Sequence, residues 1–386
     1  MPSGSWPLFS KMVDRRRFGL YVHWPFCQAK CPYCDFNSHV SANIDQERWR
    51  SCFQSEIKRA REFSGPRILD SIFFGGGTPS LMEPATVSAV IDAARDAWSS
   101  SNDMEITLEA NPTSVEAGRF RDYASVGVNR VSIGVQSFRD DALKALGRLH
   151  SAKEAKDAVD LARQYFSRVS FDLIYARQDQ SLDDWRLELG EALDFAADHL
   201  SLYQLTIEPD TAFGERFKRG RLGGLPDEDL GADMFELTQD MTAKAGLPAY
   251  EISNHAAPGA ESRHNLIYWK AGDWVGVGPG AHGRVTTDAG RFATESHSAP
   301  GQWIQSVERL GSGQSVCDLL PRADILGEAI MMGLRLAEGI PETLFEGSLK
   351  INNLVDLGML ERHEKNVRTT ARGRPVLNAI LREILA

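Results

Sequence analysis

The stretch Tyr21-Val-His-Trp-Pro-Phe-Cys27-Gln-Ala-Lys-Cys31-Pro-Tyr-Cys34-Asp-Phe36 holds three of the five cysteines of the chain. They stand at Cys-x3-Cys-x2-Cys spacing, directly after a short apolar run. Thiolates are soft, strongly donating ligands, so a tight loop that gathers three of them suits an iron–sulfur cluster or zinc better than it suits packing. We therefore expect a metal centre on Cys27, Cys31 and Cys34.

The missing fourth ligand distinguishes the two metals. Structural zinc is normally closed by four protein ligands, and ordinary ferredoxin clusters use four cysteines. Cys52 and Cys317 lie too far along the chain to extend the local pattern. A closed zinc site would have to borrow His23 or His39 and remains an alternative. A cluster on three cysteines leaves one iron open, and an open iron can bind a substrate or cofactor.

The cysteine spacing, with aromatic Tyr33 just before the third cysteine, resembles the signature of the radical S-adenosylmethionine (SAM) superfamily. The resemblance implies a four-iron four-sulfur cluster on Cys27, Cys31 and Cys34, with SAM chelated to the open iron through its amino and carboxylate groups. A disulfide is disfavoured, because the other cysteines are scattered and the N-terminus carries no secretory signal.

Composition indicates a globular protein. The chain has 386 residues, 42% of them hydrophobic, and a formal net charge of −10, which argues against nucleic acid as the main partner. Residues 1–17 lack an apolar core and predict a disordered leader. No apolar run is long enough to span a bilayer, although peripheral membrane contact is left open. A reducing cytoplasm is the natural setting for a thiolate-bound cluster.

From 18 to 208, β-rich runs alternate with amphipathic helical stretches, which is typical of βα units and a parallel sheet. The six expected strands cover residues 20–23, 71–74, 105–109, 130–135, 169–174 and 200–207. We expect an α/β fold. The radical SAM resemblance implies that 18–208 forms a partial TIM-type (βα)6 barrel.

Several polar residues follow these strands, where βα-barrels carry their chemistry. The run Gly75-Gly-Gly-Thr-Pro79 follows the second strand and frees the backbone to approach a ligand. Glu109 ends the third strand and Gln136 the fourth, and both can bind hydroxyl or amino groups. Arg148 lies on the next expected helix, and Asp172 lies in the fifth strand. Taken singly, each polar residue could equally be a structural salt bridge or cap.

Together these residues resemble the SAM-binding set of the oxygen-independent coproporphyrinogen oxidase branch of the superfamily. The resemblance implies that SAM is bound by Tyr21, Tyr33, Gly76, Gly77, Thr78, Glu109, Gln136, Arg148 and Asp172. One departure follows Tyr175, where the chain reads Ala-Arg-Gln-Asp-Gln and relatives usually carry a Gly-Leu-Pro-type turn.

The branch contains true oxidases and the HemW group of heme chaperones. The oxidase resemblance would require a further cysteine two positions after the third, where this chain has Phe36. The segment His264-Asn-Leu-Ile-Tyr-Trp269 resembles the His-Asn-x-x-Tyr-Trp motif of the chaperones. An imidazole can ligate heme iron, so His264 is the predicted heme ligand and His282 the second choice. The alternative for His264 is a hydrogen-bonded core histidine.

The resemblance to the HemW group implies a chaperone that binds heme and passes it to an acceptor protein. It implies no coproporphyrinogen oxidase activity, although enzymatic activity is left open. An oxygen-independent coproporphyrinogen III oxidase, which would act by radical decarboxylation, is the alternative function. Dimerisation and the identity of the acceptor are also left open.

The remaining chain divides in two. Residues 209–322 are expected to form a connecting region that includes the His264 segment. Residues 323–386 show helical patterns followed by a short hairpin, which suggests a winged-helix-like domain. Basic residues between Arg362 and Arg374 could contact nucleic acid in a cluster-bearing regulator, but a solvated or partner-docking face fits the acidic chain better.

Overall fold

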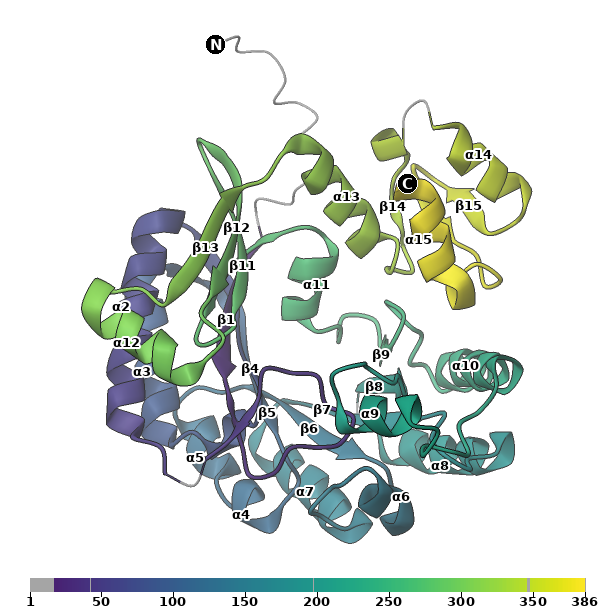
Figure 1. Ribbon diagram of the computed structural model, residues 1–386, viewed down its shortest axis with the longest axis horizontal. Coiled ribbons are helices and arrows are strands. Elements are labelled where there is room, and N and C mark those ends of the chain that lie inside the picture. The colour runs from purple at the N-terminus through teal and green to yellow at the C-terminus, as the bar shows by residue number, and fades with distance from the viewer. Residues whose placement is uncertain (1–16, 42, 197, 346–347, 386) are drawn as a thin grey trace.

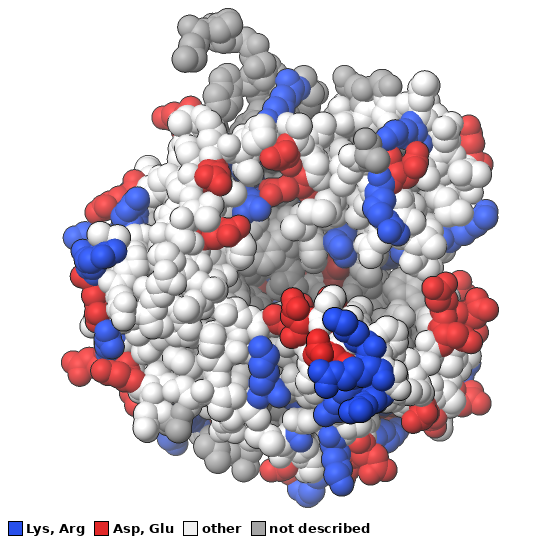
Figure 2. Space-filling view, in the orientation of Figure 1, with Lys and Arg blue, Asp and Glu red and all other residues white. Residues whose placement is uncertain are grey.

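The structure, a computed structural model, describes residues 17–41, 43–196, 198–345 and 348–385. Apart from Arg17, the predicted leader lies outside the described residues. The described chain forms one long sheet covered by helices and a smaller C-terminal module beside it (Figure 1). Basic and acidic side chains are interspersed over the face of the molecule that Figure 2 shows.

Six parallel strands form the partial barrel, in the spatial order of the sequence. They are β1 Phe18–Trp24, β4 Ile68–Gly76, β5 Ser99–Ala110, β6 Arg130–Gln136, β7 Arg168–Tyr175 and β8 His199–Gln204. Five of them contain a predicted strand in full, and β8 contains the first five residues of the strand predicted at 200–207. The predicted α/β fold with a partial (βα)6 barrel is therefore confirmed.

Amphipathic helices connect these strands and cover the outside of the sheet (Figure 1). They are α2 Gln46–Ser64, α3 Pro84–Ala97, α4 Ser114–Ala117, α5 Phe120–Ser125, α6 Asp140–Ala145, α7 Ala152–Tyr165 and α8 Leu182–Phe195. A short 3-10 turn, Pro79–Leu81, precedes α3. Capping boxes start two of the helices, with Ser151 paired to Glu154 and Ser181 paired to Asp184.

The sheet extends beyond the six parallel strands at both edges. Strand β10 Asp273–Val277 runs parallel to β1, and β9 Asn254–Ala256 runs antiparallel to β8. An antiparallel meander then continues outward from β10 through β11 His282–Thr287, β12 Gly290–Ser296 and β13 Gln314–Leu319. Much of the expected connecting region thus belongs to the main sheet. Its helices are α9 Ala212–Lys218, α10 Glu228–Lys244, α11 Arg263–Trp269 and α12 Pro300–Leu310.

The C-terminal module has helices, a hairpin and a hydrophobic core of its own, as expected for a winged-helix-like domain. Its elements are α13 Arg322–Gly333, β14 Ile340–Pro341, a 3-10 turn Glu342–Phe345, α14 Leu349–Asp356, β15 Leu360–His363, β16 Asn366–Thr369, a 3-10 turn Arg374–Val376 and α15 Leu377–Leu385. The module is tied to the barrel side by Arg374, whose Nη2 donates to the carbonyl of Glu251 at 2.9 Å.

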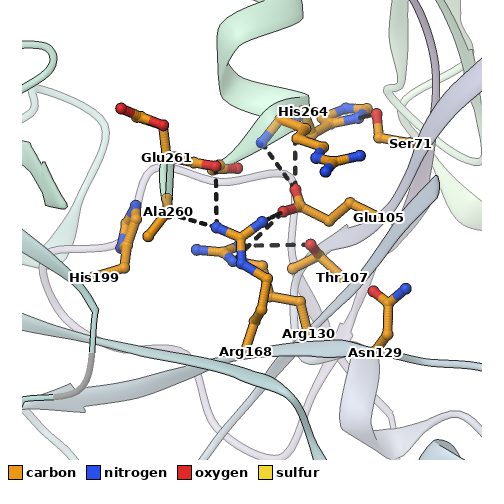
Figure 3. A network of polar contacts seen from close by, with 12 residues as sticks. Ser71, Glu105, Thr107, Asn129, Arg130, Arg168, His199, Ala260, Glu261 and His264 are labelled. Carbon is orange, nitrogen blue, oxygen red and sulfur yellow. Dashed lines mark hydrogen bonds and ion pairs between the residues drawn. The ribbon is translucent and has the colours of Figure 1, made fainter. Parts of the chain in front are cut away.

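A buried polar network lies near the amino ends of the strands, inside the barrel (Figure 3). Glu105 of β5 forms an ion pair with Arg168 of β7 and accepts from the backbone N–H of Arg263 at 3.0 Å. Arg168 also donates to the carbonyls of Ala260 and Glu261. These contacts fix the start of α11 against this end of the barrel, away from the carboxyl ends of the strands.

Among the described residues, no helix is both long and apolar enough to cross a membrane.

Candidate functional site

The cysteine loop follows β1 and crosses the carboxyl ends of the strands, where its trace is purple in Figure 1. The loop starts with β2 Phe26–Cys27, which pairs in parallel with β3 His39–Val40. Between them, the N–H of Cys34 donates to the carbonyl of Cys31 at 3.2 Å. Cys27, Cys31 and Cys34 are all half-buried free thiols. The loop therefore presents its sulfur atoms where βα-barrels carry their functional groups.

Two hydrogen-bond donors reach these sulfur atoms from other segments, Thr78 from just after β4 and Arg148 from the turn between α6 and α7. Thr78 donates its hydroxyl to the Sγ of Cys27 at 3.4 Å, and Arg148 donates Nη1 to the Sγ of Cys31 at 3.4 Å. Asn111 joins the two donors: it donates to Thr78 Oγ1 at 3.2 Å and accepts from Arg148 Nη2 at 2.6 Å. Asn111 was not among the predicted site residues, although its place just after β5 was a signal in the sequence.

The chemistry of the thiols fits a metal centre. Burial raises the pKa of the Cys27 thiol, and the neighbouring cysteines add to the increase. Burial likewise raises the pKa of Cys34. Without a cation these groups therefore favour the protonated state, whereas bound iron would stabilise the thiolates. Half-buried thiols with donors aimed at two of them form a donor set of the kind that holds an iron–sulfur cluster.

The histidines that a closed zinc site would borrow are engaged elsewhere. The ring of His23 contacts the Tyr21 hydroxyl through Nδ1 at 3.0 Å and the Asn37 carbonyl through Nε2 at 2.9 Å. His39 contacts Asn37 Oδ1 through Nε2 at 3.2 Å. Among the described residues, no three His, Cys, Asp or Glu side chains stand together as a single-ion site. The geometry of His23 thus disfavours the zinc alternative.

The glycine run lies directly beside the cysteine loop. Gly77 N–H donates to the carbonyl of Trp24 at 2.7 Å, and Thr78 N–H donates to that of Phe26 at 2.8 Å. Gly76 has a φ of 110°, and a Cβ there would lie 2.6 Å from the His23 ring. Only glycine fits this position, and it brings the backbone against the site.

Two carboxylates face the barrel interior just below the loop. Glu109 accepts from the Gly76 N–H at 3.3 Å, and Asp172 accepts from Gln136 Nε2 at 3.0 Å. Burial, reinforced by the charge of Asp172, raises the pKa of Glu109 to about 7. Burial raises the pKa of Asp172 to about 6 against the opposing effect of Arg148. Carboxylates with raised pKa values are under-compensated, so a ligand with positive charge or hydroxyl donors fits between them.

Comparisons with known proteins agree with this geometry. The model of the radical SAM superfamily matches residues 21–187, and that of the HemN C-terminal domain matches residues 320–376. Heme chaperone HemW of Escherichia coli (strain K12) is 37% identical, over 97% of this chain and 100% of its own. The chain belongs to the HemW family of radical SAM proteins. A Mus musculus protein, radical S-adenosyl methionine domain-containing protein 1, mitochondrial, is 38% identical over 96% of this chain and 87% of its own.

A solved structure shows the same fold. Coproporphyrinogen III oxidase (HemN) from Escherichia coli superposes with a TM-score of 0.81. It covers 99% of this chain and 93% of its own, at 21% sequence identity. At that identity the likeness speaks for the fold alone.

In this member of the HemW family, the nine residues predicted to bind SAM gather at one end of the barrel. They lie in the cysteine loop, in or just after strands β1, β4, β5, β6 and β7, or in the turn before α7. The hydroxyl of Tyr21 is hydrogen-bonded to Nδ1 of His23 at 3.0 Å. The ring of Tyr33 packs against Phe213 of α9, with ring centroids 6.4 Å apart. Gln136 has a φ of 68°, which places its amide beside Asp172.

His264 lies apart from this group, on α11. Its side chain is buried, with the residue 1% exposed, and stacks on Phe73 at 5.1 Å. Nδ1 contacts the Ser71 hydroxyl at 2.7 Å, and Nε2 contacts the Tyr268 hydroxyl at 2.7 Å. Because both ring nitrogens are engaged, His264 could bind heme iron only if one of these contacts were broken.

The loop after β7, where the sequence departs from its relatives, is held by its own contacts. Arg177 forms a buried ion pair with Glu188 of α8, with 2.5 Å between Nη2 and Oε2. Ala176 and Asp179 adopt positive φ values of 56° and 55°. The N–H of Asp179 donates to the carbonyl of Gly224 at 2.6 Å. The unusual sequence thus forms a turn of defined shape that is joined to the loop before α10.

Proposed function

We propose that this protein is a heme chaperone, which binds heme and passes it to an acceptor protein. The observation that carries the proposal is the full-length similarity to the heme chaperone HemW of Escherichia coli, 37% identical over 97% of this chain. Phe36 supports it, because it occupies the position where the oxidase resemblance requires a cysteine, and it is 61% exposed beside the cysteine loop.

The proposed cofactor site is a four-iron four-sulfur cluster on Cys27, Cys31 and Cys34, with SAM at the open iron. A cluster with bound SAM supplies one-electron chemistry. Thr78 and Arg148 would stabilise two of the thiolates by hydrogen bonds. Gly76 and Gly77 bring backbone groups against the SAM site, while Glu109 and Asp172 balance positive charge or accept from hydroxyls. Gln136 holds Asp172 in place, and Tyr21 and Tyr33 form the aromatic walls.

We further propose that the protein works in a reducing compartment such as the cytoplasm, because the cluster needs free thiolates. The acceptor is a protein that takes heme from an accessible carrier.

The experiment uses anaerobically reconstituted protein with SAM, offered either heme or coproporphyrinogen III. We expect a stoichiometric heme complex with a Soret band, loss of that band when an apo-cytochrome is added, and no decarboxylated porphyrinogen. Decarboxylated product without heme transfer would favour the oxidase alternative. Salt-dependent DNA binding by the same preparation would instead support a regulator that acts through the C-terminal module.

A further inference from the structure

A pocket of about 730 Å³ lies beside the cysteine loop, on the outer side of the barrel mouth. Its walls come from residues 34–39 of the loop, from the connection between β8 and α9, and from strands β11, β12 and β13. Cys34 itself belongs to the lining. The volume is in the range of sites that bind cofactors and other small molecules, and the pocket is partly open to solvent.

Accessible histidines concentrate in this pocket. Five of the nine histidines of the chain are buried in the barrel, namely His23, His150, His199, His255 and His264. His39, His282 and His297 are more accessible, and all three line the pocket. A heme that enters from solvent needs an imidazole it can reach, so this pocket offers three candidate axial ligands in one place.

His282 has the geometry of an axial ligand. It begins β11 and pairs across the strands with Glu295 of β12. Its Nδ1 lies 3.5 Å from Glu295 Oε1, and its side chain is 59% exposed. A carboxylate on the Nδ1 side of the ring favours the tautomer with the proton on Nδ1, and in that tautomer the lone pair of Nε2 can bind iron. Nε2 has no hydrogen-bond partner in the described part of the chain. His39 is less suitable, since Asn37 already engages its Nε2.

Phe36 and Lys30 complete the recognition chemistry. Phe36 lines the pocket, and 61% of its surface is exposed, so its ring is available for contact with a ligand. A flat macrocycle can cover such a ring by stacking. Among the described residues, Lys30 is the one lysine or arginine of a lining that also contains four carboxylates, namely Asp35, Glu208, Asp210 and Glu295. Heme propionates would therefore be directed toward Lys30 or solvent and away from these carboxylates.

We propose that heme binds in this pocket, with Nε2 of His282 as an axial ligand and the Phe36 ring against the macrocycle. This inference rests on the proposed chaperone function and assigns its heme site. The heme then lies beside Cys34 and the cluster, and not at His264. An open pocket in which one imidazole binds the iron suits a carrier that must release heme to another protein.

The test titrates heme into the anaerobically reconstituted protein and follows the Soret band. His282 is exposed at a strand end, so His282→Ala is expected to fold and keep its cluster. We expect this variant to shift the Soret band and weaken heme binding about ten-fold or more, with free imidazole restoring the band. Phe36→Ser should weaken binding without moving the band, because Phe36 is not a ligand. His363→Ala, an exposed histidine of the C-terminal module, is the matched control and should behave as wild type.

The outcomes are distinguishable. Wild-type protein that binds no heme would overturn the proposed function itself. Wild-type binding with an unchanged Soret band in His282→Ala would overturn the pocket assignment and leave the chaperone proposal standing. A band that moves in His297→Ala or His264→Ala but not in His282→Ala would likewise overturn the ligand named here.

Discussion

Arg148 donates Nη1 to the Sγ of Cys31 at 3.4 Å, across 117 positions of sequence. The same guanidinium binds Asn111 Oδ1 at 2.6 Å and the carbonyl of Gly134 at 2.8 Å through Nη2. One half-buried arginine therefore ties the cysteine loop to the carboxyl ends of β5 and β6. A hydrogen bond from a guanidinium to a cysteine sulfur also holds that sulfur in place as a metal ligand.

We expect Arg148→Met to lower the iron content of the reconstituted protein, because the Cys31 sulfur loses its hydrogen-bond donor and the loop loses its link to the barrel. Iron per chain and visible absorption measure the effect. Arg139→Met is the matched control, since Arg139 pairs with Glu191 at the surface, away from the sulfur atoms. Full iron content in Arg148→Met would show that the contact with Cys31 is dispensable.

The cysteine assignment makes its own prediction. We expect Ala at Cys27, Cys31 or Cys34 to abolish the cluster, because each removes one of three ligands. Cys52→Ala and Cys317→Ala should retain the cluster, since Cys52 is a buried residue of α2 and Cys317 lies exposed on β13. Iron content after anaerobic reconstitution measures both sets. A cluster lost equally in Cys52→Ala would contradict the three-ligand assignment.

The barrel could be predicted from sequence because its six strands are short, apolar and separated by capped helices. The strands β10 to β13 could not, because the glycines around 276–283 and the polar stretch 284–301 resemble a loop. Gly276 and Gly283 are needed there for close backbone approach, since a Cβ on either would lie within 2.5 Å of atoms on the neighbouring strand. That requirement depends on pairing partners distant in sequence.

Some residues of the candidate site could likewise be predicted from the sequence, and others could not. Glu109, Gln136 and Asp172 were predictable because a strand end fixes where a side chain lies. Asn111 was not, because its role depends on both Thr78 and Arg148. His264 matched a sequence motif, yet a motif does not report that Ser71 and Tyr268 engage both of its ring nitrogens.

Neutral substitutions of Glu109 and Asp172 should weaken SAM binding but stabilise the SAM-free protein. Glu109→Gln or Asp172→Asn removes a charge that faces the cofactor, and each lost charge-assisted hydrogen bond is worth about 1.5–3 kcal/mol, roughly ten- to hundred-fold in affinity. Because burial raises both pKa values, the same substitutions should raise the melting temperature of the SAM-free protein at pH 8. SAM titration and thermal unfolding measure the two effects. Unchanged SAM affinity would remove both residues from the cofactor site.

The raised pKa values also predict a pH dependence. With values of about 7 for Glu109 and about 6 for Asp172, both carboxylates gain protons between pH 8 and pH 5. SAM carries a sulfonium and an amino group, so its affinity should fall as pH falls through this range. The sign is reversed for the SAM-free fold, which binds these protons more tightly than the unfolded chain and gains stability from them. In the double variant Glu109→Gln, Asp172→Asn, most of the pH dependence of SAM binding should disappear; if it persists, other groups cause it.

The last prediction concerns His264, whose interior contacts favour a structural role. Burial, together with the charge of Arg130, lowers the pKa of His264 to about 3, so the ring is neutral and hydrogen-bonds Ser71 and Tyr268. Removing it leaves two partners unsatisfied, which costs about 1–3 kcal/mol each. We therefore expect His264→Ala to lower the free energy of unfolding by about 2–6 kcal/mol, as measured by denaturant titration. Heme bound to the folded fraction should keep the wild-type Soret position, because the ligand proposed above is His282. The structural role of His264 would be contradicted by a His264→Ala variant that has wild-type stability but has lost the Soret band. A residue that contributes only packing and hydrogen bonds cannot change the heme spectrum while the fold stays intact.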